Sequence, residues 1–144
     1  MLHSAKRRWA APAVAVAMLG AGAGVAVAKD VTGTPGPDHL RGTKDADTIH
    51  ALAGADHVRA FAGDDQVFGD AGGDRILAGA GNDKVDGGDG PDRIRGGFGD
   101  DTLDGRPGAD RLWGGPGADV LNGLWGSDRL WGGVGNDRLV GDVA

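Results

Sequence analysis

Aspartate is the residue type whose number and spacing in this sequence could do chemistry. All 21 acidic residues are Asp, and twelve of them recur at intervals of nine residues. These twelve are Asp38, Asp47, Asp56, Asp65, Asp74, Asp83, Asp92, Asp101, Asp110, Asp119, Asp128 and Asp137. Carboxylates that a repeating fold brings close together repel one another, and a divalent cation reverses that repulsion. Calcium accepts Asp carboxylates and backbone carbonyls in flexible geometry, whereas magnesium demands a stricter octahedron and zinc prefers nitrogen or sulfur. These twelve regularly spaced Asp residues, which we call the Asp column, therefore predict several calcium sites.

Catalytic chemistry has no comparable support in the sequence. No nucleophile, base and orienting residue recur together, so we predict no catalytic residues and no enzyme. His39 and His57 are 18 residues apart. Two interpretations of this pair stay open, namely a zinc or copper site and two solvated surface histidines.

The Asp residues belong to a nine-residue unit that is written twelve times without insertion from Gly33 to Val140. The sixth position is always Asp, and the fourth is Gly in every unit except the second, which has Asp45. The eighth position is always Leu, Ile or Val: Leu40, Ile49, Val58, Val67, Ile76, Val85, Ile94, Leu103, Leu112, Leu121, Leu130 and Leu139. Gly is frequent at the first, second and fourth positions, which indicates backbone with positive φ or close approach to another group.

The unit also predicts its own local structure. One apolar residue between two mostly polar neighbours is typical of a short strand with one buried face. A unit of nine residues cannot bury that residue alone, so the units must stack. We therefore expect an all-β solenoid of short strands and glycine turns with a thin core of eighth-position side chains. The chain has no cysteine, so no disulfide supports this core and a bound metal is the expected substitute.

The unit Gly-Gly-x-Gly-x-Asp-x-apolar-x resembles the RTX, or haemolysin-type, calcium-binding nonapeptide repeat. Residues 96–104 and 132–140 match it in full, and the resemblance covers residues 33–140. It implies a parallel β-roll with two repeats per turn, and calcium bound between turns by Asp side chains and backbone carbonyls. The twelve units then give six turns and ten unit pairs that could hold ions. The carbonyls expected to contribute lie around Gly79, Gly81, Gly88, Gly90, Gly97, Gly99, Gly115, Gly117, Gly133 and Gly135.

The units match the repeat unequally, which predicts sites of unequal strength. Late units begin with two glycines, as in Gly96-Gly97, whereas early ones carry Ala51-Leu52 and Ala60-Phe61. A Cβ costs strain wherever φ must be positive. We therefore expect the stronger sites at Asp74, Asp83, Asp92, Asp101, Asp110, Asp119, Asp128 and Asp137, and the weaker ones at Asp38, Asp47, Asp56 and Asp65.

A second column, at the seventh position of alternate units, is basic. It consists of Arg75, Arg93, Arg111 and Arg129, and Arg95, Trp113 and Trp131 occupy ninth positions of the same units. On the implied roll these side chains share one flat face. One interpretation is charge balance against the Asp columns. The other is a ligand face for an anionic polysaccharide, because arginine and aromatic rows can bind such polymers.

The N-terminus predicts export. Lys6, Arg7 and Arg8 precede an Ala-rich apolar run that ends in Ala26-Val27-Ala28, the pattern of a signal peptide at residues 1–28. We expect a short segment at 29–32, the β-roll at 33–140 and a tail at 141–144. Cleavage would give a secreted or cell-surface protein with no membrane span, exported by the general secretory or the twin-arginine route.

The net charge of the exported chain limits which classes of partner it can bind. Residues 29–144 hold 12 basic and 21 acidic residues, a net charge of −9, which argues against nucleic acid. The expected function is therefore a secreted calcium-binding repeat protein whose folding is coupled to calcium. The alternative is a calcium-stabilised adhesion module that binds an anionic polysaccharide or cell-surface polymer. End-to-end self-association also stays open, because exposed strand edges invite pairing.

Overall fold

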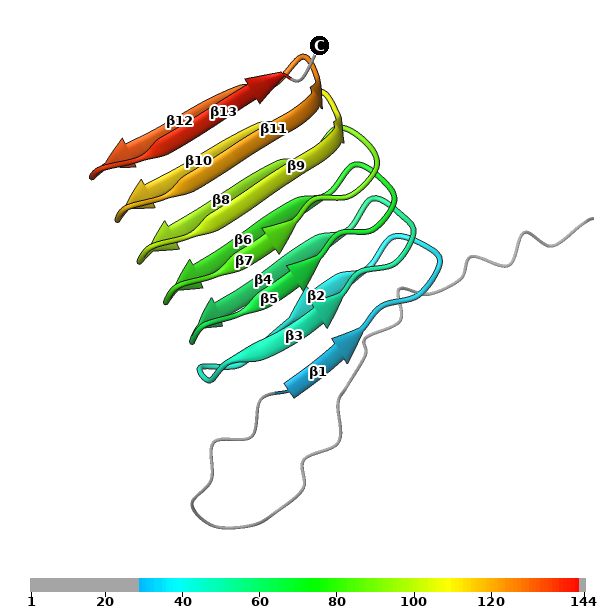
Figure 1. The fold of residues 1–144 in the computed structure, drawn as a ribbon. Helices are drawn as coiled ribbons and strands as arrows, with labels where there is room; N and C mark the ends of the chain where they lie inside the picture. Colours follow the sequence, from blue (N-terminus) through cyan, green and yellow to red (C-terminus); the bar gives the residue numbers. More distant parts are fainter. Residues whose placement is uncertain (1–28, 143–144) are drawn as a thin grey trace, which may run out of the picture.

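The computed structural model describes residues 29–142, so the expected signal peptide and residues 143–144 lie outside the described residues. Within that range the regular elements are strands (Figure 1). They are β1 (Lys29–Thr32), β2 (His39–Arg41), β3 (Asp47–His50), β4 (His57–Ala62), β5 (Gln66–Phe68), β6 (Arg75–Ala80), β7 (Lys84–Asp86), β8 (Arg93–Phe98), β9 (Thr102–Gly108), β10 (Arg111–Pro116), β11 (Val120–Gly126), β12 (Arg129–Val134) and β13 (Arg138–Asp142). No helix of the described chain is long and apolar enough to cross a membrane.

Successive strands alternate between two parallel sheets. The odd-numbered strands form a seven-stranded sheet and the even-numbered strands a six-stranded sheet. Each residue pairs with the one 18 positions further on, as in Ile49 with Val67 and Ile76 with Ile94. Two units therefore make one turn, and the turns stack into the ladder seen in Figure 1. The predicted all-β parallel β-roll with two repeats per turn is confirmed.

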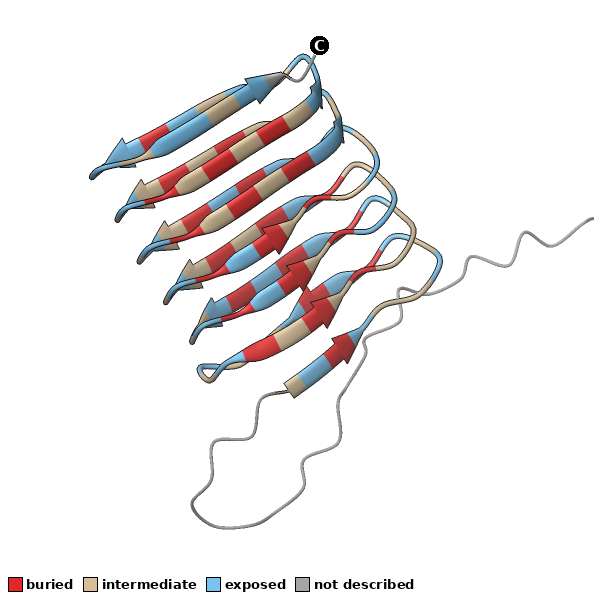
Figure 2. Cartoon of the chain, in the orientation of Figure 1, coloured by how far each residue is buried: buried red, intermediate tan, exposed pale blue. Residues whose placement is uncertain are grey.

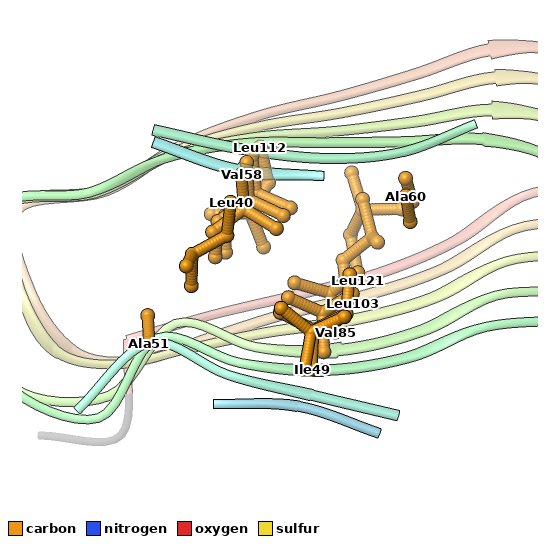
Figure 3. Close-up of a cluster of buried hydrophobic side chains, with 14 residues drawn as sticks. Leu40, Ile49, Ala51, Val58, Ala60, Val85, Leu103, Leu112 and Leu121 are labelled. Atoms are coloured by element: carbon orange, nitrogen blue, oxygen red, sulfur yellow. The ribbon is translucent and has the colours of Figure 1, made fainter. Parts of the chain in front are cut away.

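The core is the predicted eighth-position column. Its members from Leu40 to Leu121 are buried, and they point from the two sheets into the space between them (Figure 3). Alternation of buried and exposed residues along the strands is plain in Figure 2. Ala51, Ala60 and Ala78, which replace glycine at the first position, add buried methyl groups to this core. In the last turn Leu130 is only partly buried and Leu139 is 45% exposed, because no further described turn covers them.

The roll extends beyond both boundaries that the repeat predicts. Residues 29–32, expected as a separate short segment, form β1, which pairs with β3 and contributes the buried Val31 to the core. Val31 lies nine residues before Leu40, so it continues the apolar column by one unit. At the other end β13 runs to Asp142, two residues into the expected tail.

Candidate metal sites on the two turn edges

The turns that join the two sheets form two edges of the roll. We call the turns at 33–38, 51–56, 69–74, 87–92, 105–110 and 123–128 the first edge, and those at 42–47, 60–65, 78–83, 96–101, 114–119 and 132–137 the second edge. Each turn ends in one sixth-position Asp, so the twelve residues divide into two stacks of six. The ten from Asp38 to Asp119 are at most 3% exposed, whereas Asp128 and Asp137 in the last turn are only partly buried.

From Asp56 onward, one oxygen of each sixth-position carboxylate is held by the backbone of the neighbouring turn. The backbone N–H of Asp83, for example, donates to Oδ1 of Asp101 at 2.9 Å, and that of Asp101 donates to Oδ1 of Asp119 at 2.9 Å. Ten bonds of this kind, at 2.7 to 3.0 Å, run along the two stacks from Asp38 to Asp137. These bonds link the same ten unit pairs that the repeat predicts as sites.

The other oxygen has no partner within the described chain. The oxygens concerned are Oδ1 of Asp38 and Oδ2 of Asp56, Asp65, Asp74, Asp83, Asp92, Asp101, Asp110, Asp119 and Asp128. A buried acceptor without a hydrogen bond costs about 1–3 kcal/mol, and more when it is charged. Ten such atoms, six on the first edge and four on the second, are unusual for a protein interior, where buried polar atoms normally have partners. They mark the positions where a cation would complete the structure.

Glycine at the first position provides the space for this oxygen. A Cβ at Gly87 would lie 2.6 Å from Oδ2 of Asp92, and one at Gly105 would lie 2.6 Å from Oδ2 of Asp110. Neither glycine has positive φ. At Gly87 and Gly105 the missing Cβ therefore allows close approach and does not serve an unusual backbone conformation, whereas Ala51, Ala60 and Ala78 show that other units accept a Cβ at this position.

Glycine at the fourth position brings backbone carbonyls to the same edges. Gly90 has a φ of 123°, and a Cβ there would overlap the carbonyl oxygen of Gly72 in the preceding turn. Within the described residues, no hydrogen bond reaches the carbonyl oxygens of Gly72, Gly81, Gly90, Gly99 and Gly117. Four of these, all except Gly72, are among the carbonyls that the sequence predicts as ligands. Unbonded carbonyl oxygens and carboxylates are together the donor set that calcium prefers.

Burial strongly raises the pKa values of the sixth-position Asp carboxyls. It raises the pKa of Asp92 to about 8 and that of Asp101 to about 7, although the backbone hydrogen bond to each carboxylate acts in the opposite direction. Burial likewise raises the pKa of Asp65, Asp74 and Asp110 to about 6, and it raises the pKa values of Asp56, Asp83 and Asp119. Neighbouring carboxylates add to the rise. Ionised Asp is therefore costly here until a positive charge compensates it.

A second hydrogen-bond ladder exists only on the second edge among the described turns. Oδ1 of Asp64 accepts the backbone N–H of Asn82, Oδ1 of Asn82 accepts that of Asp100, and Oδ1 of Asp100 accepts that of Ala118, each at 2.8 Å. These fifth-position residues are not among the predicted site residues. The signal was present, because Asp or Asn recurs every 18 residues at 64, 82 and 100, whereas the first edge has Ala55, Gly73 and Pro91 at this position.

Backbone strain does not separate the predicted stronger calcium sites from the predicted weaker ones. Leu52 and Phe61 do have positive φ, at 75° and 88°. Arg106 and Leu124, within the group expected to be stronger, have positive φ as well. The ranking of the sites therefore remains a prediction without structural support from strain.

Side chains alone do not complete a metal site in the described part of the chain. No group of three or more His or Asp side chains there is close enough to hold an ion. An ion at the turn edges therefore needs carbonyl ligands. The rings of His39 and His57 are neighbours, with centroids 4.8 Å apart and planes at 87°. This pair has no third ligand of that kind and offers no complete zinc or copper site.

The comparison with known proteins agrees with this geometry. The family model described as "RTX calcium-binding nonapeptide repeat (4 copies)" matches the chain in six overlapping segments. These are residues 32–67, 41–76, 59–94, 77–110, 86–121 and 104–139. Together they span residues 32–139, three quarters of the chain. No curated protein gave a significant match. The stacked Asp residues of the solenoid are those of calcium-binding repeats, and the chain belongs to the RTX calcium-binding nonapeptide repeat family.

Proposed function

We propose that this protein is a secreted, non-enzymatic calcium-binding β-roll that holds up to ten ions between successive turns, five on each edge. The observation that carries the proposal is the set of ten buried carboxyl oxygens without a hydrogen-bond partner. Each belongs to an Asp whose other oxygen, with one exception at Asp38, is already held by the neighbouring turn. In the folded roll the unpartnered oxygens are therefore held in fixed positions along the turn edges.

The residues present fit calcium in donor type and charge. Sixth-position Asp side chains would supply the carboxylates, and fourth-position carbonyls such as those of Gly81 and Gly99 would supply neutral oxygens. Bound calcium would contribute positive charge to stacks of buried carboxylates, which favours their ionised form. At Gly87 and Gly105 the missing Cβ leaves room beside Oδ2 of Asp92 and Asp110.

Folding should depend on the ion. Parallel strands lie about 4.8 Å apart, and like charges at that distance repel by about 1 kcal/mol per pair even in water. The repulsion is greater for buried groups, and the core that opposes it has only one large apolar side chain in each strand, with a buried Ala added in a few turns. A chain that binds calcium only when folded is stabilised in proportion to the logarithm of the free ion concentration. The roll would then be loose where calcium is scarce and ordered where calcium is plentiful.

The expected export fits this dependence. Extracellular calcium modules bind with dissociation constants of about 0.1–1 mM, far above cytosolic calcium. A roll with sites in that range would fold only after it left the cell. The signal peptide predicted at residues 1–28 would provide the route, and the extracellular space would provide the ion.

Circular dichroism of residues 29–144 during titration with calcium, and separately with magnesium, tests the proposal. At pH 8 we expect a disordered spectrum in chelator that becomes β on addition of calcium but not of magnesium. Asp101→Asn should raise the calcium midpoint, because it removes a buried ligand. Asp100→Asn is the matched control. It removes the same charge one residue away from an exposed side chain, and Asn82 shows that an amide can accept the same hydrogen bond.

Two results would overturn the proposal. One is a β spectrum in chelator that calcium does not change, since the apolar column would then suffice for folding. The other is an equal shift of the midpoint in the Asp101→Asn and Asp100→Asn variants, since the effect would then follow net charge and not the unpartnered oxygen.

A further inference from the structure

The outer face of the six-stranded sheet has a charge opposite to that of the rest of the roll. We call its seventh- and ninth-position side chains the arginine face. It contains seven arginines, Arg41, Arg59, Arg75, Arg93, Arg95, Arg111 and Arg129, together with His39, His57, Leu77, Trp113 and Trp131. None of these twelve residues is acidic, although residues 29–144 carry a net charge of −9. The equivalent positions of the seven-stranded sheet are mixed and include Asp86 and Asp104.

The arginines of this face are unpaired within the described chain. The single salt bridge among the described residues joins Arg106 to Asp86, which lie elsewhere. The register places Arg75 beside Arg93, Arg93 beside Arg111, and Arg111 beside Arg129. Like charges directly opposite on neighbouring strands are destabilising. Charge balance against the turn carboxylates would bring the guanidinium groups to the edges, and that contact is not seen.

The seventh-position side chains form one row on this face and the ninth-position side chains form another. A groove of about 720 Å³ runs between the two rows. Five arginines line it: Arg59, Arg75, Arg93, Arg95 and Arg111. The rows cross the six even-numbered strands, and five strand spacings make them about 24 Å long. A row of this length exceeds what a small anion could contact, and its positive groups repeat at the strand spacing. The ligand that matches it is a linear chain with negative groups at regular intervals.

The tryptophans indicate which kind of polymer fits. Trp113 and Trp131 stack on each other with ring centroids 4.7 Å apart and planes at 5°. The Arg95 guanidinium lies 5.3 Å from the Trp113 ring centroid. Trp113 therefore presents no free ring face, whereas proteins that bind single-stranded nucleic acid use open aromatic faces on which bases stack. The Trp113 ring therefore positions Arg95 and stiffens the face. Trp131, at the end of the row, is 43% exposed, but one ring is not the run of platforms on which successive bases stack.

A nucleic acid duplex fits no better. Proteins read duplex DNA with a helix or ribbon that projects into a groove, and a flat sheet has no such projection. The exposed turn residues Asp64, Asp70, Asp89 and Asp100 would lie beside so broad a ligand and repel its phosphates. A narrow polymer that lies in the groove avoids them. Its carboxylates would meet guanidinium groups, which bind carboxylates with two parallel hydrogen bonds.

From these observations we infer that the arginine face is a binding site for a linear, carboxylate-bearing polysaccharide lying along the axis of the roll. The site shares no residue with the proposed calcium ligands, which lie on the turn edges. It gives the roll a role beyond calcium binding, because the ion would order a surface that recognises an extracellular polymer.

Retention of the calcium-saturated protein on immobilised hyaluronan, at low ionic strength, tests the inference. Neutral dextran serves as the uncharged polymer and a single-stranded oligothymidylate as the nucleic acid. We expect binding to hyaluronan, none to dextran, and weaker binding to the oligonucleotide. In the double variant R93S/R111S the dissociation constant for hyaluronan should rise by about tenfold or more, since charge-assisted hydrogen bonds are lost.

The matched control is the double variant K84S/R138S. Lys84 and Arg138 occupy the same seventh position on the opposite sheet and are exposed, so the change in charge and the place in the repeat are identical. This variant should bind hyaluronan with less than about a threefold change. Calcium-induced circular dichroism must be normal in both variants, which separates loss of the face from loss of the fold and from failure of the proposed calcium function.

Three results would overturn the inference. They are no retention of the folded protein on hyaluronan, an equal loss of binding in the two double variants, and tighter binding to the oligonucleotide than to hyaluronan. The second would show that net charge decides, and the third would make the occupant a nucleic acid.

Discussion

Protons should replace calcium in stabilising the roll, and this is the sharpest consequence of the buried Asp stacks. The perturbation is a fall in pH from 8 to 5 in the presence of a chelator. In the metal-free roll the pKa of Asp92 is about 8 and that of Asp101 about 7, above the usual value of 3.8. The folded state therefore binds more protons than the unfolded state at every pH between 3.8 and those values. Stability is present at low pH and is lost as pH rises through 6 to 8.

The size of the effect follows from the individual shifts. One pKa unit corresponds to about 1.4 kcal/mol, so between pH 8 and pH 5 protonation of Asp92 recovers about 4 kcal/mol and that of Asp101 about 3 kcal/mol. Asp65, Asp74 and Asp110, with pKa values of about 6, add about 1 kcal/mol each. Asp74, Asp92 and Asp110 share one stack, so their contributions are coupled and the total is smaller than the separate values suggest. Even if coupling halves the combined value, the remaining gain of about 5 kcal/mol is as large as the whole stability of many domains.

The assay is circular dichroism in chelator, together with thermal unfolding, at several pH values. We expect the β signal and the unfolding temperature of the metal-free protein to rise as the pH falls from 8 to 5. With calcium the sign reverses, because protons compete for the same carboxylates, so the calcium midpoint should rise on acidification. Asp92→Asn, a permanently neutral side chain, should stabilise the metal-free protein at pH 8 and weaken calcium binding, whereas the exposed Asp89→Asn should do neither. Loss of metal-free β structure on acidification from pH 8 to 5 would refute this reasoning.

Two further predictions concern packing and backbone geometry. Leu103→Ala, at a fully buried position, should lower the free energy of unfolding of the calcium-loaded roll by about 2–5 kcal/mol in urea titrations. Leu139→Ala, at the exposed end of the same column, should lower it by less than about 1 kcal/mol, and equal losses would contradict a core that ends near Leu121. Gly90→Ala should cost more than about 2 kcal/mol and raise the calcium midpoint, because it combines a positive φ with overlap on the Gly72 carbonyl. Gly36→Ala occupies the same position of the repeat in open space without a positive φ, so it should leave both quantities unchanged, and a similar cost at both glycines would show that the carbonyl approach does not matter.

The repeat period made much of this fold predictable. A strict spacing of nine residues fixes which side chains stack, so the eighth-position core and the arginine row followed from counting alone. Even β1 was within reach, because Val31 continues the apolar column although Lys29 stands where the next Asp would be. What hid it was the missing glycine turn, since residues before Gly33 lack the rest of the unit.

The chemistry of each turn was less accessible, because it depends on where individual oxygens lie. Spacing alone could show that Asp residues stack, but not that one oxygen of each accepts a neighbouring backbone N–H while the other stays unpartnered. The sequence likewise could not separate the two needs for glycine. Gly87 leaves room beside Asp92, at a position where other units carry Ala, whereas Gly90 is required for its backbone conformation. Both positions are glycine in the repeat, so the sequence alone does not distinguish the two roles.

The two proposed sites are linked through charge. Without calcium, residues 29–144 carry a net charge of −9, and their Asp stacks flank the arginine face on both edges. Long-range repulsion of a polyanion would then oppose any local attraction, because fields from the whole surface act over about 8–10 Å at physiological salt. Each bound calcium adds two positive charges, so five ions would already reverse the sign and ten would make the roll strongly cationic. Calcium would thus act twice on the arginine face, first by ordering the strands that carry it and then by cancelling the carboxylates that repel its ligand.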